Sequence, residues 1–300
     1  MISPSSLKKG DIIGLVAPAR RISKQELTKA IRIIESRGYK VEQGKYLFAT
    51  ENQFAGSDEQ RAADMQQMLE NPEIKAIFAV RCGYGSVRIV DRVDFRPLLK
   101  NPKWLAGYSD FTIFLNHLIN IGLQSLHATM PLNFATNTPE ALDSLFDVLG
   151  GKKPHYRFAA QHLNRNGEAH GILMGGNLSV LYSLMGSRSF PEIAGKILFL
   201  EDLDEYLYHI DRMLMALKRA GLLENLSGLL IGGMTDMHDN TIPFGKTAED
   251  IIRESVEEYD FPVAFGFPAG HQSDNRTLIM GAEVRLEVKE TGSKLIFSKP

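Results

Sequence analysis

The first half of the chain alternates short apolar runs with segments in which apolar residues recur every three or four positions. Short apolar runs bounded by turn residues indicate buried strands, and the second spacing indicates amphipathic helices. Strands are predicted at residues 11–19, 39–41, 74–80 and 104–107. This alternation favours a parallel sheet with helices on both of its faces.

Three helices of this half have recognisable starts. Ser23 and Ser57 each stand three residues before Glu26 and Gln60, the spacing of a capping box, in which side chain and backbone satisfy each other at a helix start. The third helix follows the strand at 104–107, and its apolar residues lie on one stripe. That stripe consists of Phe111, Phe114, Leu115, Leu118 and Ile119.

The second half of the chain is richer in predicted strand and reads as a small barrel or a curled sheet. Helices are predicted at about 206–220 and 246–258. Strands are predicted at residues 196–202, 226–233, 261–268, 277–288 and 294–298.

The fold class predicted from these patterns is α/β, with a parallel-sheet domain followed by a β-rich, barrel-like domain. The polar stretch that begins at Gly-Gly-Lys-Lys-Pro reads as a linker. The predicted divisions are residues 1–150 for the N-terminal domain, 151–170 for the linker and 171–300 for the C-terminal domain.

Composition narrows the function classes. The 300 residues are 44% hydrophobic and 23% charged, with a formal net charge of -2 and no long basic run, so a nucleic-acid partner is not expected. No apolar run approaches the roughly 18 residues of a membrane span. One cysteine excludes an intrachain disulfide, and the lack of a signal-peptide pattern favours the cytoplasm. We expect no cofactor and no metal, because neither a phosphate or dinucleotide fingerprint nor a convergent ligand spacing is present.

Three polar or glycine-rich turns follow the predicted strands of the first half: APA at 17–19, RCGYG at 81–85 and GYSD at 107–110. Ligands bind at the carboxyl ends of parallel strands. Ser109 at such a turn is either an exposed nucleophile or a helix cap. Because Phe111 replaces the second glycine of a G-x-S-x-G motif, this motif alone favours the cap.

The RCGYG turn also allows two interpretations. Glycines directly after a strand expose backbone N–H donors to an oxyanion or substrate, but they also make a tight turn. Cys82 is either a reactive thiol or a small buried apolar group.

Carboxylates and a histidine complete the candidate set. Glu201, Asp202, Asp204 and Glu205 follow a predicted strand, where one could orient an imidazole or all could belong to a solvated acidic loop. His271 lies in a loop next to glycine, where it could act as a general base. Each signal is weak alone, but the order Ser…Glu…His suits a catalytic triad in a cleft between two domains.

At this point the chain resembles the serine LD-carboxypeptidases, also called muramoyltetrapeptide carboxypeptidases. The resemblance runs through ordered motifs over nearly the whole length. They are VAPA (16–19), FAGSDEQRAADM (54–65), IKAIFAVRCGYGSVRIVD (74–91), GYSDFT (107–112), GGNLSVLYSLMGS (175–187), LFLEDLDEYLYHIDRML (198–214) and AGHQSDNRTLIMG (269–281).

The resemblance implies the fold given above and a triad between the two domains. It implies that Ser109 is the nucleophile, His271 the base and Glu201 the residue that orients His271, with Glu205 as the nearest rival for that role. The implied oxyanion donors are the backbone N–H groups of Asp110 and Gly83. The family commonly has glycine where this chain has cysteine in RCGYG, which raises the question of the backbone angles available there.

The implied activity is a cofactor-free serine peptidase of cell-wall recycling. It would release C-terminal D-alanine from murein tetrapeptides, through an acyl-enzyme, as a cytoplasmic homodimer. The candidates for contacting the substrate are Tyr84, Arg81, Arg88 and Arg276.

Two rival functions are considered. The related microcin-immunity peptidases cleave peptidyl or aminoacyl acyl-sulfamoyl nucleotides and would need an aromatic platform for the base. Trp104, the only tryptophan, falls in a predicted strand, which is evidence against that role. The second rival is a non-catalytic protein that binds a small ligand between two domains.

Overall fold

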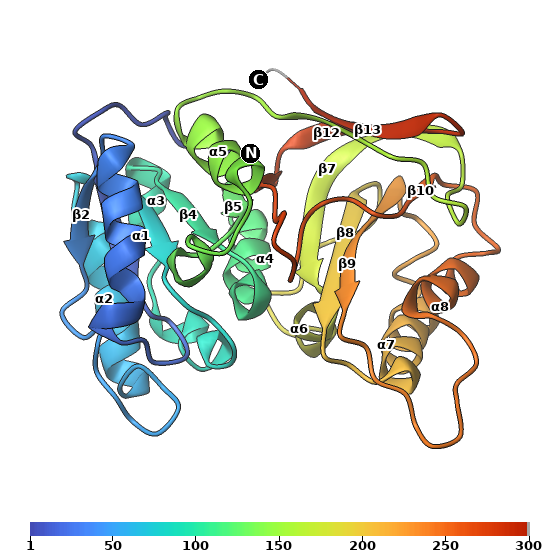
Figure 1. The fold of residues 1–300 in the computed structure, drawn as a ribbon, viewed down its shortest axis with the longest axis horizontal. Coiled ribbons are helices and arrows are strands. Elements are labelled where there is room, and N and C mark those ends of the chain that lie inside the picture. The colour runs from blue at the N-terminus through green and yellow to red at the C-terminus, as the bar shows by residue number, and fades with distance from the viewer. Residues whose placement is uncertain (299–300) are drawn as a thin grey trace.

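The N-terminal half forms a parallel sheet that a strand from the far end of the chain completes. The structure is a computed structural model that describes residues 1–298 (Figure 1). The strand order is β11-β5-β4-β3-β1-β2, in which only β11 is antiparallel to its neighbour. The strands are β1 (Ile12–Val16), β2 (Lys40–Gln43), β3 (Ile74–Ala79), β4 (Trp104–Gly107), β5 (Ser125–His127) and β11 (Leu278–Met280).

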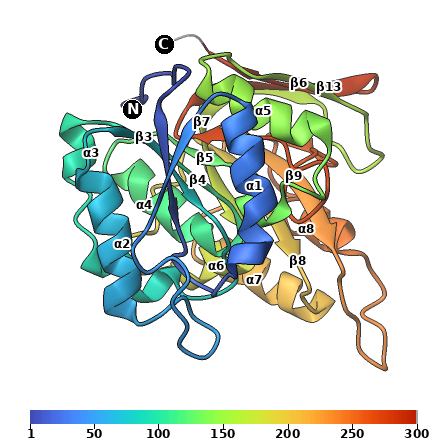
Figure 2. The same cartoon turned by 60° about the vertical axis from the view of Figure 1, so that its left-hand side comes forward.

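Helices cover both faces of this first sheet (Figure 2). Helices α1 and α5 lie on one side, and α2, α3 and α4 lie on the other, as right-handed crossovers between parallel strands require. Both predicted capping boxes form, at the starts of α1 and α2. The bounds are α1 (Lys24–Ser36), α2 (Asp58–Glu70), α3 (Pro97–Lys100), α4 (Thr112–Asn120) and α5 (Pro139–Leu149).

The second half forms a seven-stranded mixed sheet beside the first (Figure 1). Its order is β10-β9-β8-β7-β12-β13-β6, and paired main-chain bonds join Val263 of β10 to Arg165 just before β7. The strands are β6 (His155–Phe158), β7 (Gly167–Asn177), β8 (Ile197–Leu203), β9 (Gly228–Thr235), β10 (Val263–Ala264), β12 (Glu283–Lys289) and β13 (Gly292–Phe297). The helices are α6 (Leu178–Ser183), α7 (Leu207–Arg219) and α8 (Ala248–Ser255).

The α/β fold class with a β-rich second part is confirmed, but three local predictions need correction. The stretch 151–170 is not an unstructured linker, because it contains β6 and the start of β7, and Tyr156 is buried there. The strand predicted at 277–288 breaks at Gly281 (φ +82) into β11 and β12, which belong to different sheets. The strand predicted at 261–268 shortens to the two residues of β10.

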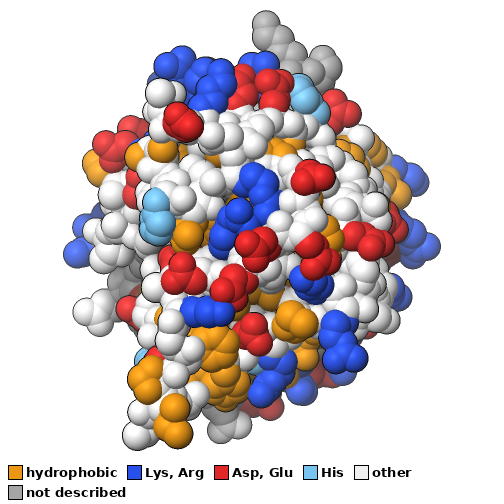
Figure 3. Space-filling model, turned by 90° about the vertical axis from the view of Figure 1, so that its right-hand side faces the viewer, with side chains coloured by type: hydrophobic (Ala, Val, Ile, Leu, Met, Phe, Trp, Pro, Cys, Tyr) orange, Lys and Arg blue, Asp and Glu red, His pale blue; other side chains and the backbone are white. Residues whose placement is uncertain are grey.

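The surface of the second half mixes charges of both signs. On the face that Figure 3 shows, basic and acidic side chains are interspersed with small hydrophobic patches. Within residues 1–298, no helix combines the length and the apolar character that crossing a bilayer requires.

Candidate active site

Ser109 stands at a sharp turn between β4 and α4, and its backbone is in the left-handed region at φ +64°. A non-glycine residue held there is strained, and such residues cluster at active sites. Gly107 makes the turn possible, since a Cβ on it would lie 2.7 Å from the ring of Phe111. The sequence G-Y-S-D-F therefore builds a nucleophile turn in which a phenylalanine packs over the first glycine.

Helix α4, which follows this turn, packs against β7 of the second sheet. Asn116, fully buried, donates to Gly175 O (2.9 Å) and accepts from Gly175 N–H (3.2 Å) at the end of β7. Thr112 Oγ1 accepts from Asn177 N–H at 3.0 Å, and a Cβ on Gly176 would lie 2.5 Å from that oxygen. The Gly-Gly-Asn sequence of β7 is therefore the surface on which α4 docks.

The same edge carries Glu201. In the parallel pairing of β7 and β8, Asn177 is the register partner of Glu201, so docking of α4 brings Ser109 to the strand end that holds this carboxylate. The register of β8 with β9 shifts between Leu200 and Asp202, as at a β-bulge, a device that re-aims side chains next to active sites. Glu201 is fully buried.

Glu201 holds His271 through two hydrogen bonds to one oxygen. Glu201 Oε2 lies 2.7 Å from His271 Nδ1 and 3.2 Å from the backbone nitrogen of His271. Gly270 permits this approach, because a Cβ on it (φ +109) would lie 2.7 Å from Glu201 Oε2. The imidazole is 13% exposed, so one side of it is open to solvent.

Tyr108, the residue before Ser109, packs against His271. The rings of Tyr108 and His271 have centroids 4.8 Å apart. Within residues 1–298, the only ring hydrogen bond of His271 is the one from Nδ1 to Glu201. The structure thus brings the three predicted residues into one region and makes the His271–Glu201 hydrogen bond, but no hydrogen bond from His271 to Ser109 Oγ.

The acid–base properties of the pair follow from their surroundings. Burial alone would lower the pKa of His271, but the Glu201 carboxylate beside it raises that pKa above 6.5. Burial alone would raise the pKa of Glu201, and the charge and hydrogen bond of His271 lower it overall. Glu201 therefore stays ionised and increases the proton affinity of the imidazole, which suits a general base.

The neighbouring carboxylates are engaged elsewhere. Glu205 Oε2 lies 2.6 Å from Nδ1 of His209, one turn along α7. Asp202 accepts from the Asn177 amide and from Ser179 N–H, both at 2.8 Å, and so caps the start of α6. Neither acid reaches His271, which leaves Glu201 as the only member of the acidic cluster that does so within residues 1–298.

The RCGYG turn lies against the serine turn. Asp110 is buried, and its carboxylate accepts from Ser86 N–H at 2.8 Å. Gly83 and Gly85 have φ values of +118° and +146°, whereas Cys82 is not among the residues with positive φ. The cysteine therefore occupies a backbone position that any residue can adopt. Its thiol is buried, and burial followed by the charge of Asp110 raises its pKa well above the usual value, so it stays protonated.

Arg61 of α2 ties two of the predicted strand-end turns together. Its guanidinium, 2% exposed, donates to Pro18 O at 2.7 Å and to Gly85 O at 3.0 Å, and it pairs with Asp58. The turns APA and RCGYG are thus held at a fixed separation by a buried cation. The capping box that predicts the start of α2 gives no sign of this role.

The four proposed substrate-contact residues fall into two groups. Arg81 lines a cavity beside the RCGYG turn, and Tyr84 is 47% exposed on that turn. Arg88 is bound to Asp58, and Arg276 is bound to Asp274 and lines a different hollow, between α5 and β6. Arg81 and Tyr84 belong to the RCGYG turn, and the three arginines all pair with acidic residues: Arg81 with Glu26, Arg88 with Asp58 and Arg276 with Asp274.

His127 was not predicted as part of the site, but it lies beneath it. Its ring is fully buried between Tyr108 and Phe199, with centroids 5.9 and 5.0 Å away. Burial lowers its pKa to about 4, so the ring is neutral at physiological pH. Within residues 1–298, no three His, Cys, Asp or Glu side chains are grouped to hold a metal ion.

Comparison with known proteins identifies relatives along both halves of the chain. Residues 13–128 match the LD-carboxypeptidase N-terminal domain, and residues 170–286 match the LD-carboxypeptidase C-terminal domain. The chain is 34% identical to the probable murein peptide carboxypeptidase of Bacillus subtilis, over 96% of this chain and 92% of that protein. It is 29% identical to the murein tetrapeptide carboxypeptidase of Pseudomonas aeruginosa, over 92% of each chain.

Solved structures agree with this result. The muramoyltetrapeptide carboxypeptidase of Oxalobacter formigenes superposes with a TM-score of 0.89 at 28% identity, over 96% of this chain and 99% of that one. The microcin-immunity protein MccF in complex with glutamyl sulfamoyl guanosine superposes with a TM-score of 0.88 at 20% identity, over 99% and 98%. At that identity the second likeness is one of fold.

Proposed function

The chain belongs to the LD-carboxypeptidase family, and we propose that it releases the C-terminal D-alanine of murein tetrapeptides through a triad of Ser109, Glu201 and His271. The observation that carries this proposal is the buried carboxylate of Glu201, 2.7 Å from Nδ1 of His271, on β8 beside the end of β7 on which the helix that follows Ser109 (φ +64°) docks. This is the arrangement of a base held by its orienting acid beside a strained nucleophile turn.

In the proposed reaction, Ser109 Oγ attacks the carbonyl carbon of the L,D bond, and His271 Nε2 accepts the serine proton. The tetrahedral oxyanion accepts hydrogen bonds from the backbone N–H groups of Asp110 and Gly83. Collapse breaks the C–N bond, and the imidazolium gives its proton to the amine of the leaving D-alanine. Water then attacks the acyl ester with His271 as base, which restores the Ser109 hydroxyl.

Substrate binding would complete the contact between Ser109 and His271. Catalytic hydrogen bonds are often loose without substrate and tighten in the complex. The left-handed backbone of Ser109 and the double anchorage of His271 on Glu201 support a short approach rather than a large rearrangement.

The proposal also includes where and with what the enzyme works. We expect a cytoplasmic homodimer in cell-wall recycling, without nucleic-acid or membrane partners, built as an N-terminal domain (1–150), a connecting segment (151–170) and a C-terminal domain (171–300). The mixed charges on the face in Figure 3 support the lack of a polyanionic partner. Light scattering on purified protein tests the dimer.

The rival functions receive less support. The relatives with higher identity carry carboxypeptidase names, and Trp104 is buried in β4 with its indole N–H donating to Ser5 O, so it offers no aromatic platform. A non-catalytic binding protein would have no need for a strained serine beside a histidine–carboxylate pair.

The deciding experiment measures D-alanine release from a purified murein tetrapeptide, with wild-type protein and the Ser109→Ala variant. We expect release by wild type alone. Release by both proteins would remove Ser109 from the mechanism. Release by neither, with labelling of Ser109 by a fluorophosphonate, would keep a serine hydrolase but exclude this substrate.

A further inference from the structure

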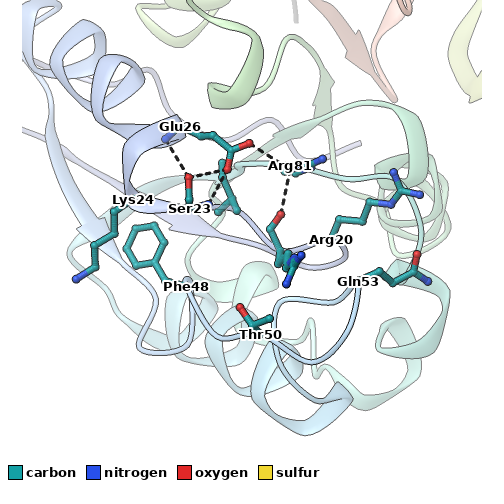
Figure 4. Close-up of a pocket in the computed structure, with 10 residues that line it drawn as sticks. Arg20, Ser23, Lys24, Glu26, Phe48, Thr50, Gln53 and Arg81 are labelled. Atoms are coloured by element: carbon teal, nitrogen blue, oxygen red, sulfur yellow. Dashed lines mark hydrogen bonds and ion pairs between the residues drawn. The ribbon is translucent and has the colours of Figure 1, made fainter.

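A cavity of about 710 Å³ lies beside the RCGYG turn, on the carboxyl-end side of β1 and β3 (Figure 4). Its walls come from the segment that leads from β1 into α1, from the loop after β2, and from Arg81 after β3. The volume falls within the range of sites that bind small ligands. The lining residues are Arg20, Arg21, Ile22, Ser23, Lys24, Glu26, Phe48, Thr50, Gln53 and Arg81.

The lining is strongly basic. Four cationic side chains face one carboxylate, that of Glu26, which pairs with Arg81 at 3.4 Å. Glu26 also accepts from the backbone N–H and the hydroxyl of Ser23 in the capping box. Among residues 1–298, Arg20, Arg21 and Lys24 have no carboxylate within ion-pair distance, and Lys24 Nζ lies 5.7 Å from the centroid of the Phe48 ring.

This basic cavity adjoins the reacting centre. A Cβ built on Gly83, the proposed oxyanion residue, would lie 2.6 Å from Cδ and 2.9 Å from Nε of Arg20. The Arg20 side chain therefore passes directly over the RCGYG turn, of which Arg81 is the first residue. A ligand in the cavity would be continuous with a peptide bound at Ser109.

The chemistry of the lining suits anionic oxygens, and the anionic groups of a murein peptide are carboxylates. The guanidinium groups of arginine and the ammonium group of lysine bind carboxylate oxygens, while Thr50 and Gln53 offer further polar contacts. A murein tetrapeptide carries free carboxylates besides the one at its C-terminus. A peptide whose side carboxylates are amidated would leave these cations without a partner.

We propose that this cavity is a carboxylate subsite, in which Arg20, Arg21 and Lys24, together with Arg81, bind the free carboxylates of the stem peptide outside the scissile bond. The inference rests on the proposed function for the identity of the peptide. Three cations of the segment that leads from β1 into α1 would then make the protein prefer stem peptides with free side carboxylates over amidated ones.

The test is calorimetric binding to the Ser109→Ala protein, which separates recognition from turnover. Two tetrapeptides are compared, one with free side carboxylates and one with these groups amidated, both with a free C-terminus. We expect amidation to weaken binding by about tenfold, as for the loss of a charged hydrogen bond. Adding Arg20→Gln and Lys24→Gln should reduce that difference to about twofold or less.

Lys29→Gln is the matched control, because Lys29 is exposed on the same helix, α1, but does not line the cavity. It should keep the full discrimination. Equal binding of the two peptides by the Ser109→Ala protein, or binding of neither, would overturn the subsite.

Wild-type turnover tells the two ideas apart. If wild type releases D-alanine but the peptides bind equally, the subsite fails and the proposed function stands. If wild type releases none while amidation still weakens binding through Arg20 and Lys24, the proposed function fails and the subsite stands.

Discussion

At the scale of single residues, Glu201 does two things with one oxygen. Its Oε2 accepts from the backbone N–H of His271 and from the imidazole Nδ1–H, so it fixes both the loop and the tautomer of the ring. A buried carboxylate with this geometry leaves Nε2 as the basic nitrogen. The same contact sets the proton affinity of the base, which gives a prediction for the pH profile.

We expect kcat/KM to rise with pH along a limb whose midpoint lies above 6.5. The base must be neutral to accept the serine proton, and Glu201 raises the pKa of His271 above its usual value, so protonation persists to higher pH than in a free histidine. Glu201→Gln should move the limb to lower pH, since the lowering effect of burial on the pKa of His271 then outweighs the remaining charge effect of Asp202. A pH–rate profile of both proteins checks this, and an unmoved limb would show that another group titrates.

The choice between the two glutamates is tested by the amide variants. Glu201→Gln should lower kcat by about 10² to 10⁴-fold, as for other residues that orient a catalytic histidine. Glu205→Gln should change it little, because Glu205 pairs with His209 on α7. His271→Ala should abolish turnover while the circular dichroism spectrum stays native. A larger loss in Glu205→Gln than in Glu201→Gln would make our assignment of the carboxylate wrong.

Sequence alone predicts the candidate residues that the structure gathers in one region, but not how they are held. The order of serine, acid and histidine and the strand-end turns are local signals, readable without a fold. The left-handed backbone of Ser109, the bulge at Glu201 and the buried Arg61 depend on contacts between segments far apart in the chain. The spacing of apolar residues along the sequence gives no information about such contacts.

At the scale of elements, α4 is the part that would align Ser109, the proposed nucleophile, with His271, its proposed base. It starts three residues after Ser109 and docks on β7 through Thr112 and Asn116. A buried asparagine would be costly without these partners. The docking contact is therefore specific for one placement of the serine turn relative to Glu201.

Asn116→Ala should destabilise the protein by about 2 kcal/mol, because it leaves the N–H and C=O of Gly175 buried without partners. It should also lower kcat, since the serine turn loses its fixed position. Asn120→Ala is the matched control. Asn120 ends the same helix and bonds to Arg188 O and Phe190 O at an exposed position. Urea unfolding and D-alanine release measure both effects, and equal losses in the two variants would contradict this role.

Strand β6 and the division between β11 and β12 could not be predicted from the sequence pattern. The run at 277–288 reads as one strand-like stretch in the sequence, and nothing in its pattern indicates that Gly281 separates two strands of different sheets. Strand β6 lies in the stretch that the sequence predicts to be a linker. Only Tyr156 and part of Phe158 are buried in it, so its alternation of apolar and polar residues is too short to stand out from the polar residues around it. Both depend on partners distant in sequence.

At the scale of the whole molecule, the two sheets share chain segments. Strand β11 pairs with β5 at the edge of the first sheet, with Leu278, Ile279 and Met280 all buried. Just before it, Thr277 N–H donates to Ser144 Oγ of α5, and Thr138 N–H donates to Ser273 O. The segment that follows His271 is therefore anchored on the N-terminal half, whereas Phe267 and Ala269 before it bond to β9 of the second sheet.

This sharing predicts that residues 1–150 do not form a stable domain alone. Without β11, the β5 edge would expose unpaired backbone groups and apolar side chains, a known cause of aggregation. The face of α4 that docks on β7 would also be uncovered. We expect the 1–150 fragment to aggregate or to lack cooperative thermal unfolding, whereas the full chain unfolds in a single transition. A fragment that is monomeric by light scattering and unfolds cooperatively would show instead that the N-terminal sheet is complete without β11, and that the two parts merely meet at the active site.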